Sequence, residues 1–208
     1  MTPFEQLVTA FERFPGVGLR QARRFAFHTL NLQANDAKHL ADLITSLSAS
    51  VSVCASCRRY FSPTAYGDQD HCAICSDVNR QLDQLLVVAF DGDIQAIEKS
   101  KVYEGLYFVL GGTVPLLNSK ENDTKLRGGA LKKLISTRLP EVKKLEVILG
   151  FAVNPDGENT GRYVESLLKD WVAEDKIKIS YLGRGLSTGS ELEYADAETI
   201  KNALRGRG

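Results

Sequence analysis

Cys54-Ala-Ser-Cys57 and Cys72-Ala-Ile-Cys75 are two Cys-x-x-Cys pairs, and together they contain every cysteine of this 208-residue chain. Each pair can hold a metal ion from one tight turn, and the 14-residue gap between the pairs lets both close on the same ion. Four thiolates at the corners of a tetrahedron are the ligand set of a structural zinc site. The spacing therefore predicts one structural Zn²⁺ per chain, held in a zinc finger over residues 54–76.

The cysteines also admit two other interpretations. Four cysteines can form disulfides in three pairings, and a single Cys-x-x-Cys pair can act as a redox motif. No signal peptide precedes them, which favours the cytoplasm, where thiols stay reduced. A redox motif would also need only one of the two pairs. Metal binding is therefore the expected role of all four cysteines, in a cytoplasmic protein.

The composition fits a soluble globular protein and gives no sign of a membrane protein. Hydrophobic residues make up 43% of the chain and charged residues 25%, and no apolar run approaches the ~20 residues that span a bilayer. The formal net charge is zero, so the molecule as a whole does not attract polyanions. Basic residues nevertheless gather in residues 13–24 and 120–144, and either segment could bind phosphates. For residues 120–144 we expect a solvated helix face instead.

Helical periodicity characterises the first 50 residues. Apolar residues recur at helical spacing in residues 3–13 and 19–31. A third helix is expected to begin near Asn35 or Asp36, since either side chain can cap it. This helix is expected to bury one apolar stripe, formed by Leu40, Leu43, Ile44 and Leu47. The pattern predicts a small helical lobe ahead of the zinc finger.

Strands and helices alternate after the zinc finger. Four apolar runs are predicted to be strands, at residues 85–90, 106–110, 145–149 and 177–182. Four helices are predicted to follow them, at residues 93–100, 125–139, 158–173 and 196–205. This alternation predicts an α/β fold, with a mostly parallel four-stranded sheet and helices on both of its faces.

The segment Pro15-Gly16-Val17-Gly18 separates the first two predicted helices. Glycines on either side of one apolar residue allow a tight hairpin, which leaves backbone N–H groups at the start of the second helix, where the dipole favours an anion. Arg20 and Arg24 lie one turn apart on that helix and can face the same phosphate path. The hairpin resembles the helix-hairpin-helix motif of DNA-binding proteins, which contacts backbone phosphates and not bases. The alternative is a plain helical corner whose glycines serve packing.

Acidic residues are predicted at the carboxyl ends of two strands, where functional groups gather in parallel sheets. Asp91 and Asp93 follow the first strand, and the pair Asp156 and Glu158 opens the helix after the third. Asp156 and Glu158, two residues apart beside a glycine turn, could hold Mg²⁺. Together with Asp91 and Asp93 they resemble the Toprim fold of topoisomerases and primases. That resemblance implies a catalytic glutamate at the end of the first strand, paired with an Asp-x-Asp after the third, but Ala89 stands at the glutamate position and can neither transfer a proton nor bind a metal. Stabilisation of the helix dipole is the favoured role of Asp156 and Glu158.

The chain resembles the bacterial RecR family in three segments that occur in order over nearly its whole length: residues 14–28 (FPGVGLRQARRFAFH), 71–80 (HCAICSDVNR) and 184–196 (RGLSTGSELEYAD). The resemblance implies four parts, which are a helix-hairpin-helix region at 1–53, a Cys₄ zinc finger at 54–76, a Toprim-like α/β domain at 77–175 and a C-terminal strand–helix region at 176–208.

The resemblance also implies a function without enzymatic activity. RecR proteins are recombination mediators in DNA repair that bind DNA, form homodimers or ring-like homotetramers, and act with RecO or RecF to load RecA on gapped DNA. DNA contacts are then expected at Gly16, Gly18, Arg20 and Arg24, and partner contacts at Asp156 and Glu158. Two alternatives remain open: a Mg²⁺-dependent Toprim enzyme that cleaves or joins DNA, and a zinc-stabilised adaptor that binds only protein.

Three features depart from the family pattern. Arg20 replaces the usual lysine and keeps its charge. The gap between the cysteine pairs is longer by several residues, chiefly through Tyr60–Asp70, so the finger carries an extended loop. Ala89 replaces the glutamate of the first strand, which weakens any Mg²⁺ site.

Overall fold

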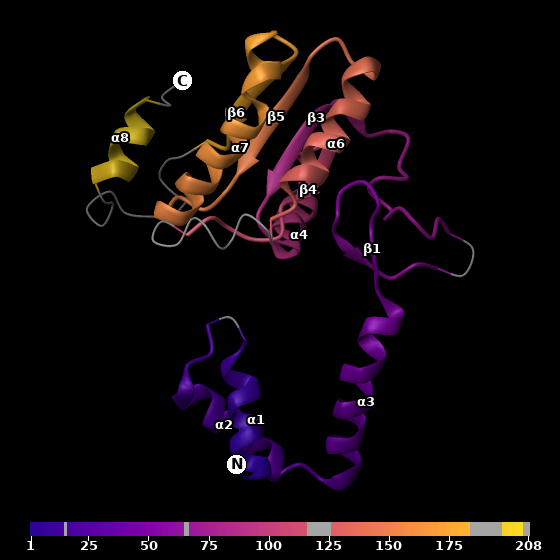
Figure 1. The fold of residues 1–208 in the computed structure, drawn as a ribbon, viewed down its shortest axis with the longest axis vertical. Coiled ribbons are helices and arrows are strands. Elements are labelled where there is room, and N and C mark those ends of the chain that lie inside the picture. Colours follow the sequence, from indigo (N-terminus) through magenta and orange to yellow (C-terminus); the bar gives the residue numbers. More distant parts are fainter. Residues whose placement is uncertain (15, 65–66, 116–125, 184–196, 206–208) are drawn as a thin grey trace. The chain divides into compact units, whose positions relative to one another are not determined.

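The computed structural model of the chain describes residues 1–14, 16–64, 67–115, 126–183 and 197–205 (Figure 1). Its residues fall into two compact units, Met1–Val51 and Ser52–Gly208. The finer division of the second unit at residues 76 and 175 remains a prediction. Among the described helices, none has the length and apolar character that a bilayer-spanning segment requires.

The first unit contains the three predicted helices, α1 (Pro3–Glu12), α2 (Leu19–Leu30) and α3 (Ala34–Ser50). α1 starts with a capping box, in which Thr2 Oγ1 accepts from the Glu5 N–H at 3.3 Å and the Glu5 carboxylate accepts from the Thr2 N–H at 2.7 Å. α1 and α2 pack against each other around Val8, Ala22 and Ala26. The two small alanines let the helices approach closely, and this contact forms the core of the hairpin.

The prediction that α3 buries its apolar stripe is wrong for this unit. Leu40, Leu43, Ile44 and Leu47 are between 41% and 65% exposed. Their period predicted the helix correctly, but a period does not say whether a second surface covers the apolar face. The predicted cap is also wrong. α3 begins at Ala34 with Gln33 at the N-cap and no side-chain cap bond, so Asn35 and Asp36 lie inside its first turn.

The second unit contains a four-stranded sheet in the order β4-β3-β5-β6, with every pair parallel. The strands are β3 (Gln81–Val88), β4 (Gly105–Val109), β5 (Leu145–Gly150) and β6 (Ile177–Tyr181). Residues 85–88 of β3 are at most 1% exposed, as expected for a central strand covered on both faces. Because β6 pairs with β5, the sheet continues past residue 175. The predicted α/β class and the parallel sheet are confirmed.

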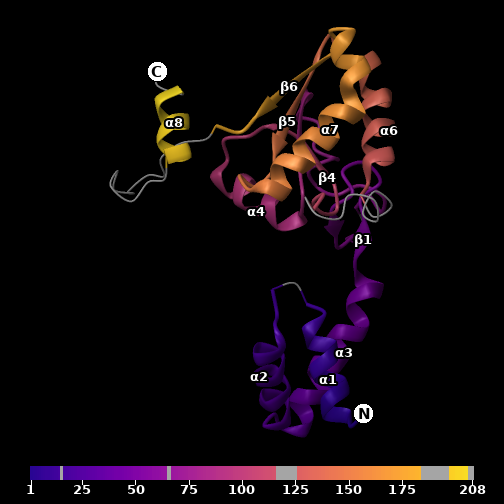
Figure 2. The ribbon, with the colours of Figure 1, turned by 60° about the vertical axis from the view of Figure 1, so that its left-hand side comes forward.

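Helices cover both faces of this sheet. They are α4 (Asp91–Ser100), α6 (Gly128–Arg138), continued by the short 3₁₀ helix η1 (Leu139–Glu141), and α7 (Pro155–Ala173). α6 and α7 lie side by side on one face and α4 lies on the other (Figure 2), as right-handed crossovers in opposite directions require. α8 (Ala197–Arg205) follows β6, and a two-stranded antiparallel ladder, β1 (Ser52–Val53) with β2 (Tyr60–Phe61), precedes β3.

The start of α7 is fixed by its N-cap. Asn154 Oδ1 accepts a hydrogen bond from the Gly157 N–H at 2.8 Å, and Pro155 occupies the first helical position. Gly157 is buried, and a Cβ at this residue would overlap the backbone carbonyl oxygen of Ala152. This turn sets the direction of the helix that carries Asp156 and Glu158.

We therefore expect Gly157→Ala to destabilise the protein by about 2–3 kcal/mol, because the obstructing atom is backbone and cannot rotate away. Urea denaturation followed by circular dichroism measures the change. Gly129→Ala on α6 is the matched control. A Cβ there meets open space, so that variant should be neutral or gain about 0.5–1 kcal/mol. Equal urea concentrations at the midpoint of unfolding for the two variants would contradict the close packing described for Gly157.

Candidate functional site

The four cysteines come together in one cluster. Their four Sγ atoms all lie within 4.8 Å of one another, and the Cys57 and Cys72 sulfurs are 3.6 Å apart. A tetrahedral zinc ion with bonds of about 2.3 Å holds its sulfurs about 3.8 Å apart, so the spacing fits one ion. All four are free thiols, and Cys54, Cys57 and Cys72 are buried. The donor set and its geometry therefore suit a tetrathiolate metal centre, and no disulfide joins the four cysteines.

Local turns place the two pairs. The Cys54 N–H donates to the Arg59 carbonyl at 2.9 Å and the Arg58 N–H donates to the Cys54 carbonyl at 3.1 Å, which closes the first turn. Arg58 has a φ of 64°, the left-handed conformation such a turn requires. The second pair meets the first directly, since the Cys72 N–H donates to Cys54 Sγ at 3.4 Å. An N–H aimed at a sulfur stabilises the thiolate that a metal ion needs.

The proximity of the thiols changes their proton affinity. Hydrogen bonds from Cys57, Cys72 and Cys75 hold the pKa of Cys54 far below its ordinary value. The same bonding to Cys54 raises the pKa of Cys57 and of Cys75. The cluster therefore keeps thiols beside a thiolate, and a divalent cation would bind by displacing the remaining protons.

Three hydrogen bonds join the cysteine turns to the rest of the second unit. The Val109 N–H at the end of β4 donates to the Cys57 carbonyl at 2.8 Å, and Arg127 Nη1 donates to the Arg58 carbonyl at 2.6 Å. The Tyr60 N–H of β2 donates to Asp91 Oδ1 at 2.7 Å. Asp91, one of the acids that the sequence places after the first strand, therefore holds the cysteine module against the start of α4.

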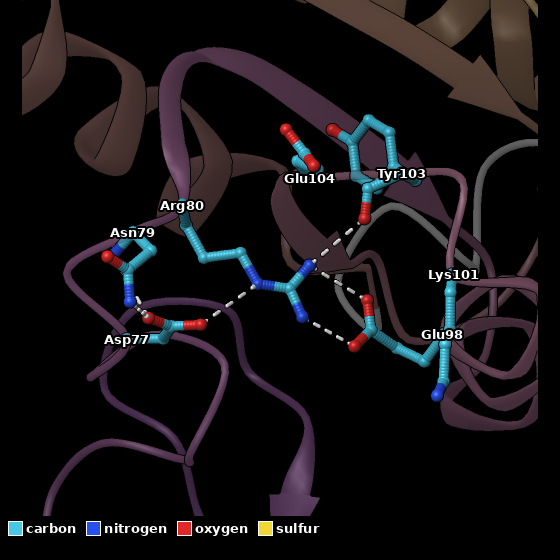
Figure 3. A pocket seen from close by; sticks show the side chains of 7 residues that line it. All are labelled: Asp77, Asn79, Arg80, Glu98, Lys101, Tyr103 and Glu104. Atoms are coloured by element: carbon cyan, nitrogen blue, oxygen red, sulfur yellow. Dashed lines mark hydrogen bonds and ion pairs between the residues drawn. The ribbon is translucent and has the colours of Figure 1, made fainter.

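Arg80 makes a second connection, five residues after Cys75. Figure 3 shows its guanidinium pointing across a pocket to α4, where it donates to Glu98 Oε1 at 2.9 Å and to Glu98 Oε2 at 2.5 Å. Its Nη1 also donates to the Tyr103 and Gly105 carbonyls, both at 3.3 Å. Because its nitrogens are engaged in this way, Arg80 anchors the chain after the finger and is not available to bind an anion. Sequence reasoning missed this pair, since no local pattern connects residues 18 positions apart.

The hairpin between α1 and α2 has the geometry that the sequence predicted, and Pro15 lies outside the described residues. Gly16 has a φ of 75°, and the Val17 side chain packs against the α1–α2 core. Gly18 is the N-cap of α2 and makes no side-chain cap bond. Arg20 and Arg24 are exposed on α2 one turn apart, and Arg23 is exposed beside them. The first-turn amides and the guanidinium groups are therefore accessible at one end of α2.

The other predicted acids do not form a metal site among the described residues. Asp156 and Glu158 lie in the first turn of α7, and Glu158 approaches Arg162 to 4.0 Å. The Asp93 carboxylate accepts from the Phe90 N–H at 2.9 Å at the start of α4. Ala89 is buried between β3 and α4. Within the described part of the chain, the four cysteines are the one group of His, Cys, Asp or Glu residues close enough to share an ion.

Comparison with known proteins agrees with this architecture. A family model described as RecR, helix-hairpin-helix, matches residues 4–47, and one described as RecR, C-terminal, matches residues 185–207. Recombination protein RecR of Streptococcus sanguinis strain SK36 is 34% identical over 206 residues, covering 99% of this chain and 96% of that protein. The chain belongs to the RecR family. RecR of Streptococcus gordonii strain Challis is also 34% identical over 206 residues, and RecR of Streptococcus pneumoniae strain CGSP14 is 33% identical over 207, each with the same coverage.

The Arg80–Glu98 pair should make stability depend on pH. Arg80, together with the Tyr107 hydroxyl that donates at 2.7 Å, holds the pKa of Glu98 below its ordinary value of 4.5. Ionised Glu98 therefore stabilises the fold above that value, and this contribution is lost as the pH falls from 4.5 through the lowered pKa. Glu98→Gln should cost about 1–3 kcal/mol near pH 7.

The measurement compares the free energy of unfolding of wild type and Glu98→Gln at a series of pH values. The difference should be constant above about pH 5 and should shrink below 4.5. Glu104→Gln, from an exposed residue that lines the same pocket, is the control and should cost much less at pH 7. A Glu98→Gln penalty that grows on acidification would show that the pair does not stabilise the folded state.

Proposed function

We propose that this chain is a recombination mediator in DNA repair that binds DNA without sequence preference and has no enzymatic activity of its own. The observation that carries the proposal is the hairpin, which presents uncapped amides and exposed arginines at one end of α2. Relatives that cover nearly the whole chain are named recombination proteins. By its family, it acts in the cytoplasm with RecO, RecF or both to load RecA on gapped or single-stranded DNA.

Gly16 and Gly18 support a phosphate-binding role for different reasons. A φ of 75° at Gly16 is a conformation that other residues rarely adopt. Gly18 has an ordinary φ of −85°, and a Cβ there would meet nothing within 4 Å. Gly18 is the N-cap of α2, a position that glycine favours in many helices, and its missing side chain would also let a phosphate approach the helix start closely.

We propose zinc as the metal of the cysteine cluster, held by Cys54, Cys57, Cys72 and Cys75. Bound zinc would contribute folding free energy directly, since it crosslinks two turns 18 residues apart. The turns of the finger are tied to β4 and α4, so the metal would also stabilise one side of the sheet domain.

Self-association and partner binding are proposed at two further surfaces. The exposed apolar stripe of α3 supports assembly as a homodimer or ring-like homotetramer, because an uncovered helix face of this kind marks an interaction surface. Asp156 and Glu158 are proposed to meet a basic surface on RecO or RecF. The boundaries at 53, 76 and 175 remain the proposed division into helix-hairpin-helix region, finger, Toprim-like domain and C-terminal region.

The main alternative is a Mg²⁺-dependent Toprim enzyme that cleaves or joins DNA. It is disfavoured by Ala89 at the position of the expected glutamate and by the structural hydrogen bonds of Asp91 and Asp93. Incubation with supercoiled DNA and Mg²⁺ separates this alternative from a mediator, which leaves the DNA intact. A protein-only adaptor, the other alternative, would lack salt-sensitive DNA affinity.

The zinc proposal predicts one zinc per chain by elemental analysis of protein purified without chelators. Cys57→Ser should lose the metal and become insoluble or protease-sensitive, because the site contributes to folding. Ser56→Ala, a change of an adjacent residue that supplies no thiol, is the control and should keep the metal. Well under one zinc per chain in the wild type would contradict the proposal.

The DNA proposal predicts that Arg20→Ala with Arg24→Ala weakens binding and flattens its salt dependence. Each phosphate contact contributes about 0.7–0.9 to the slope of log affinity against log salt, so the slope should fall by about one to two. Random and defined DNA sequences should be affected alike. Gly16→Val should weaken binding by another route, because a β-branched residue resists the left-handed turn.

Lys133→Ala with Lys143→Ala is the matched control, since it removes the same charge from exposed residues of the other basic segment. This double variant should bind as wild type does. If instead the Arg20 and Arg24 variant, folded by circular dichroism, kept affinity and slope, the hairpin would be only a structural corner. A loss confined to the lysine variant would assign the DNA surface to residues 120–144.

A further inference from the structure

Arg127 lies where the cysteine module, the end of β4 and the start of α6 meet. It is half-buried, and its Nη1 donates to the Arg58 carbonyl at 2.6 Å and, over a longer distance of 3.4 Å, to the Val109 carbonyl. The Arg127 N–H donates to the Leu110 carbonyl at 3.0 Å, and Arg127 is the N-cap of α6. One arginine therefore joins three segments that are distant from one another in the sequence.

The first cysteine turn needs support at the carbonyl that Arg127 holds. Arg58 directly follows Cys57, and its φ of 64° is a conformation that residues other than glycine adopt only at a cost in free energy. The Val109 N–H holds the preceding carbonyl, that of Cys57, at 2.8 Å. The bonds from Val109 and Arg127 thus orient the peptide planes on both sides of Arg58. These two planes define the φ and ψ of that residue, so the two bonds fix its left-handed conformation.

The conformation of Arg58 decides whether the turn closes. The Arg58 N–H donates to the Cys54 carbonyl at 3.1 Å, and the Cys54 N–H donates to the Arg59 carbonyl at 2.9 Å. A rotation about the bonds of Arg58 would break this pair of hydrogen bonds and change the distance between the two thiols of the turn. A tetrahedral metal ion needs both sulfurs in fixed directions. The geometry of the first ligand pair therefore depends on a residue that supplies no thiol.

The guanidinium of Arg127 is itself held in place. Arg127 Cζ lies 6.0 Å from the centroid of the Tyr60 ring, within the range of a cation–π contact. The stem of the side chain lies against Gly111, which has a φ of 92°, and a Cβ on Gly111 would come within 3.3 Å of Arg127 Nε. A glycine at this residue therefore leaves room for the stem, and the donor is fixed at the Arg58 carbonyl before a metal binds.

We propose that Arg127 is a positioning residue for the cysteine cluster, which keeps the first Cys-x-x-Cys turn in its metal-binding conformation by holding the Arg58 carbonyl. It acts on the backbone and contacts no sulfur. The inference rests on the proposed zinc site. It gives the start of α6 a part in setting the affinity of the finger for its metal. Because such coupling is reciprocal, bound metal in turn stabilises the contacts of Arg127 with β4 and with the turn.

The test measures the zinc affinity of the full-length protein by competition with a chromophoric chelator. Arg127→Met removes the hydrogen-bond donors and keeps an unbranched side chain beside Gly111. Residues that orient the ligands of a metal commonly change its affinity by about 10–100-fold, and we expect a loss of this size in Arg127→Met.

Two control variants separate positioning from other effects. Gly157→Ala destabilises the sheet domain at the start of α7, where the added Cβ meets the Ala152 backbone, and leaves the cysteine turns untouched. Arg162→Met makes the same chemical change at an arginine whose side chain is 70% exposed. Arg162→Met should bind zinc as wild type does. Gly157→Ala should lose much less zinc affinity than Arg127→Met for the same fall in melting temperature.

A purely structural Arg127 predicts a different result, in which Arg127→Met and Gly157→Ala lose zinc affinity in the same proportion to their fall in melting temperature. That result, or wild-type zinc affinity in Arg127→Met, would overturn the inference. If Arg127→Met is insoluble, Arg127→Lys, which keeps the charge and loses the guanidinium, is compared with Gly157→Ala in the same way. Wild-type protein that binds no zinc would instead refute the zinc proposal itself, so the two failures are distinguishable.

Discussion

The convergence of four thiols on one point is the constraint on which the second unit depends. A turn on each side of a long loop must bring its sulfurs to within 4.8 Å of the others, and the backbone of the first turn must at the same time pair with β4. The Cys57 carbonyl accepts from Val109, the last residue of β4. The cysteine cluster and the edge of the sheet are therefore joined directly by a backbone hydrogen bond. A disturbance of the thiols is expected to reach the sheet, because the same residues belong to both.

The acids that follow β3 take part in hydrogen bonds that hold the fold together. In a parallel sheet this edge collects functional groups. Here Ala89 is buried at that edge, Asp93 closes the first turn of α4, and Asp91 holds the finger through Tyr60. Asp91 and Asp93, the two acids that follow β3, therefore make structural hydrogen bonds. The site at this edge is therefore a junction between the finger and the sheet domain.

The sequence predicted well what is encoded locally. The Cys-x-x-Cys spacing predicted the cluster of four cysteines, the Gly16 and Gly18 pattern predicted the hairpin, and runs such as 85–90 predicted the strands, because each signal lies within a few residues. Sequence-based prediction failed where the burial of a side chain or its hydrogen-bond partner depends on residues far away in the chain. The helical period of α3 did not indicate whether its apolar stripe is buried or exposed. The N-cap residue Gln33 makes no side-chain cap bond, so the start of α3 had no capping residue by which to recognise it. Nothing near Arg80 in the chain indicates its partner, since Glu98 lies 18 residues away on α4.

The bare apolar stripe on α3 has a consequence for how the first unit folds. α3 has 17 residues, and most of the stability of helices in proteins comes from packing of their apolar face rather than from helix propensity. Leu43, Ile44 and Leu47 are exposed, so their own chain supplies little of this packing. If the proposed self-association covers the stripe, the helical content of α3 rises with protein concentration by mass action, and dilution unfolds α3 before it affects the sheet.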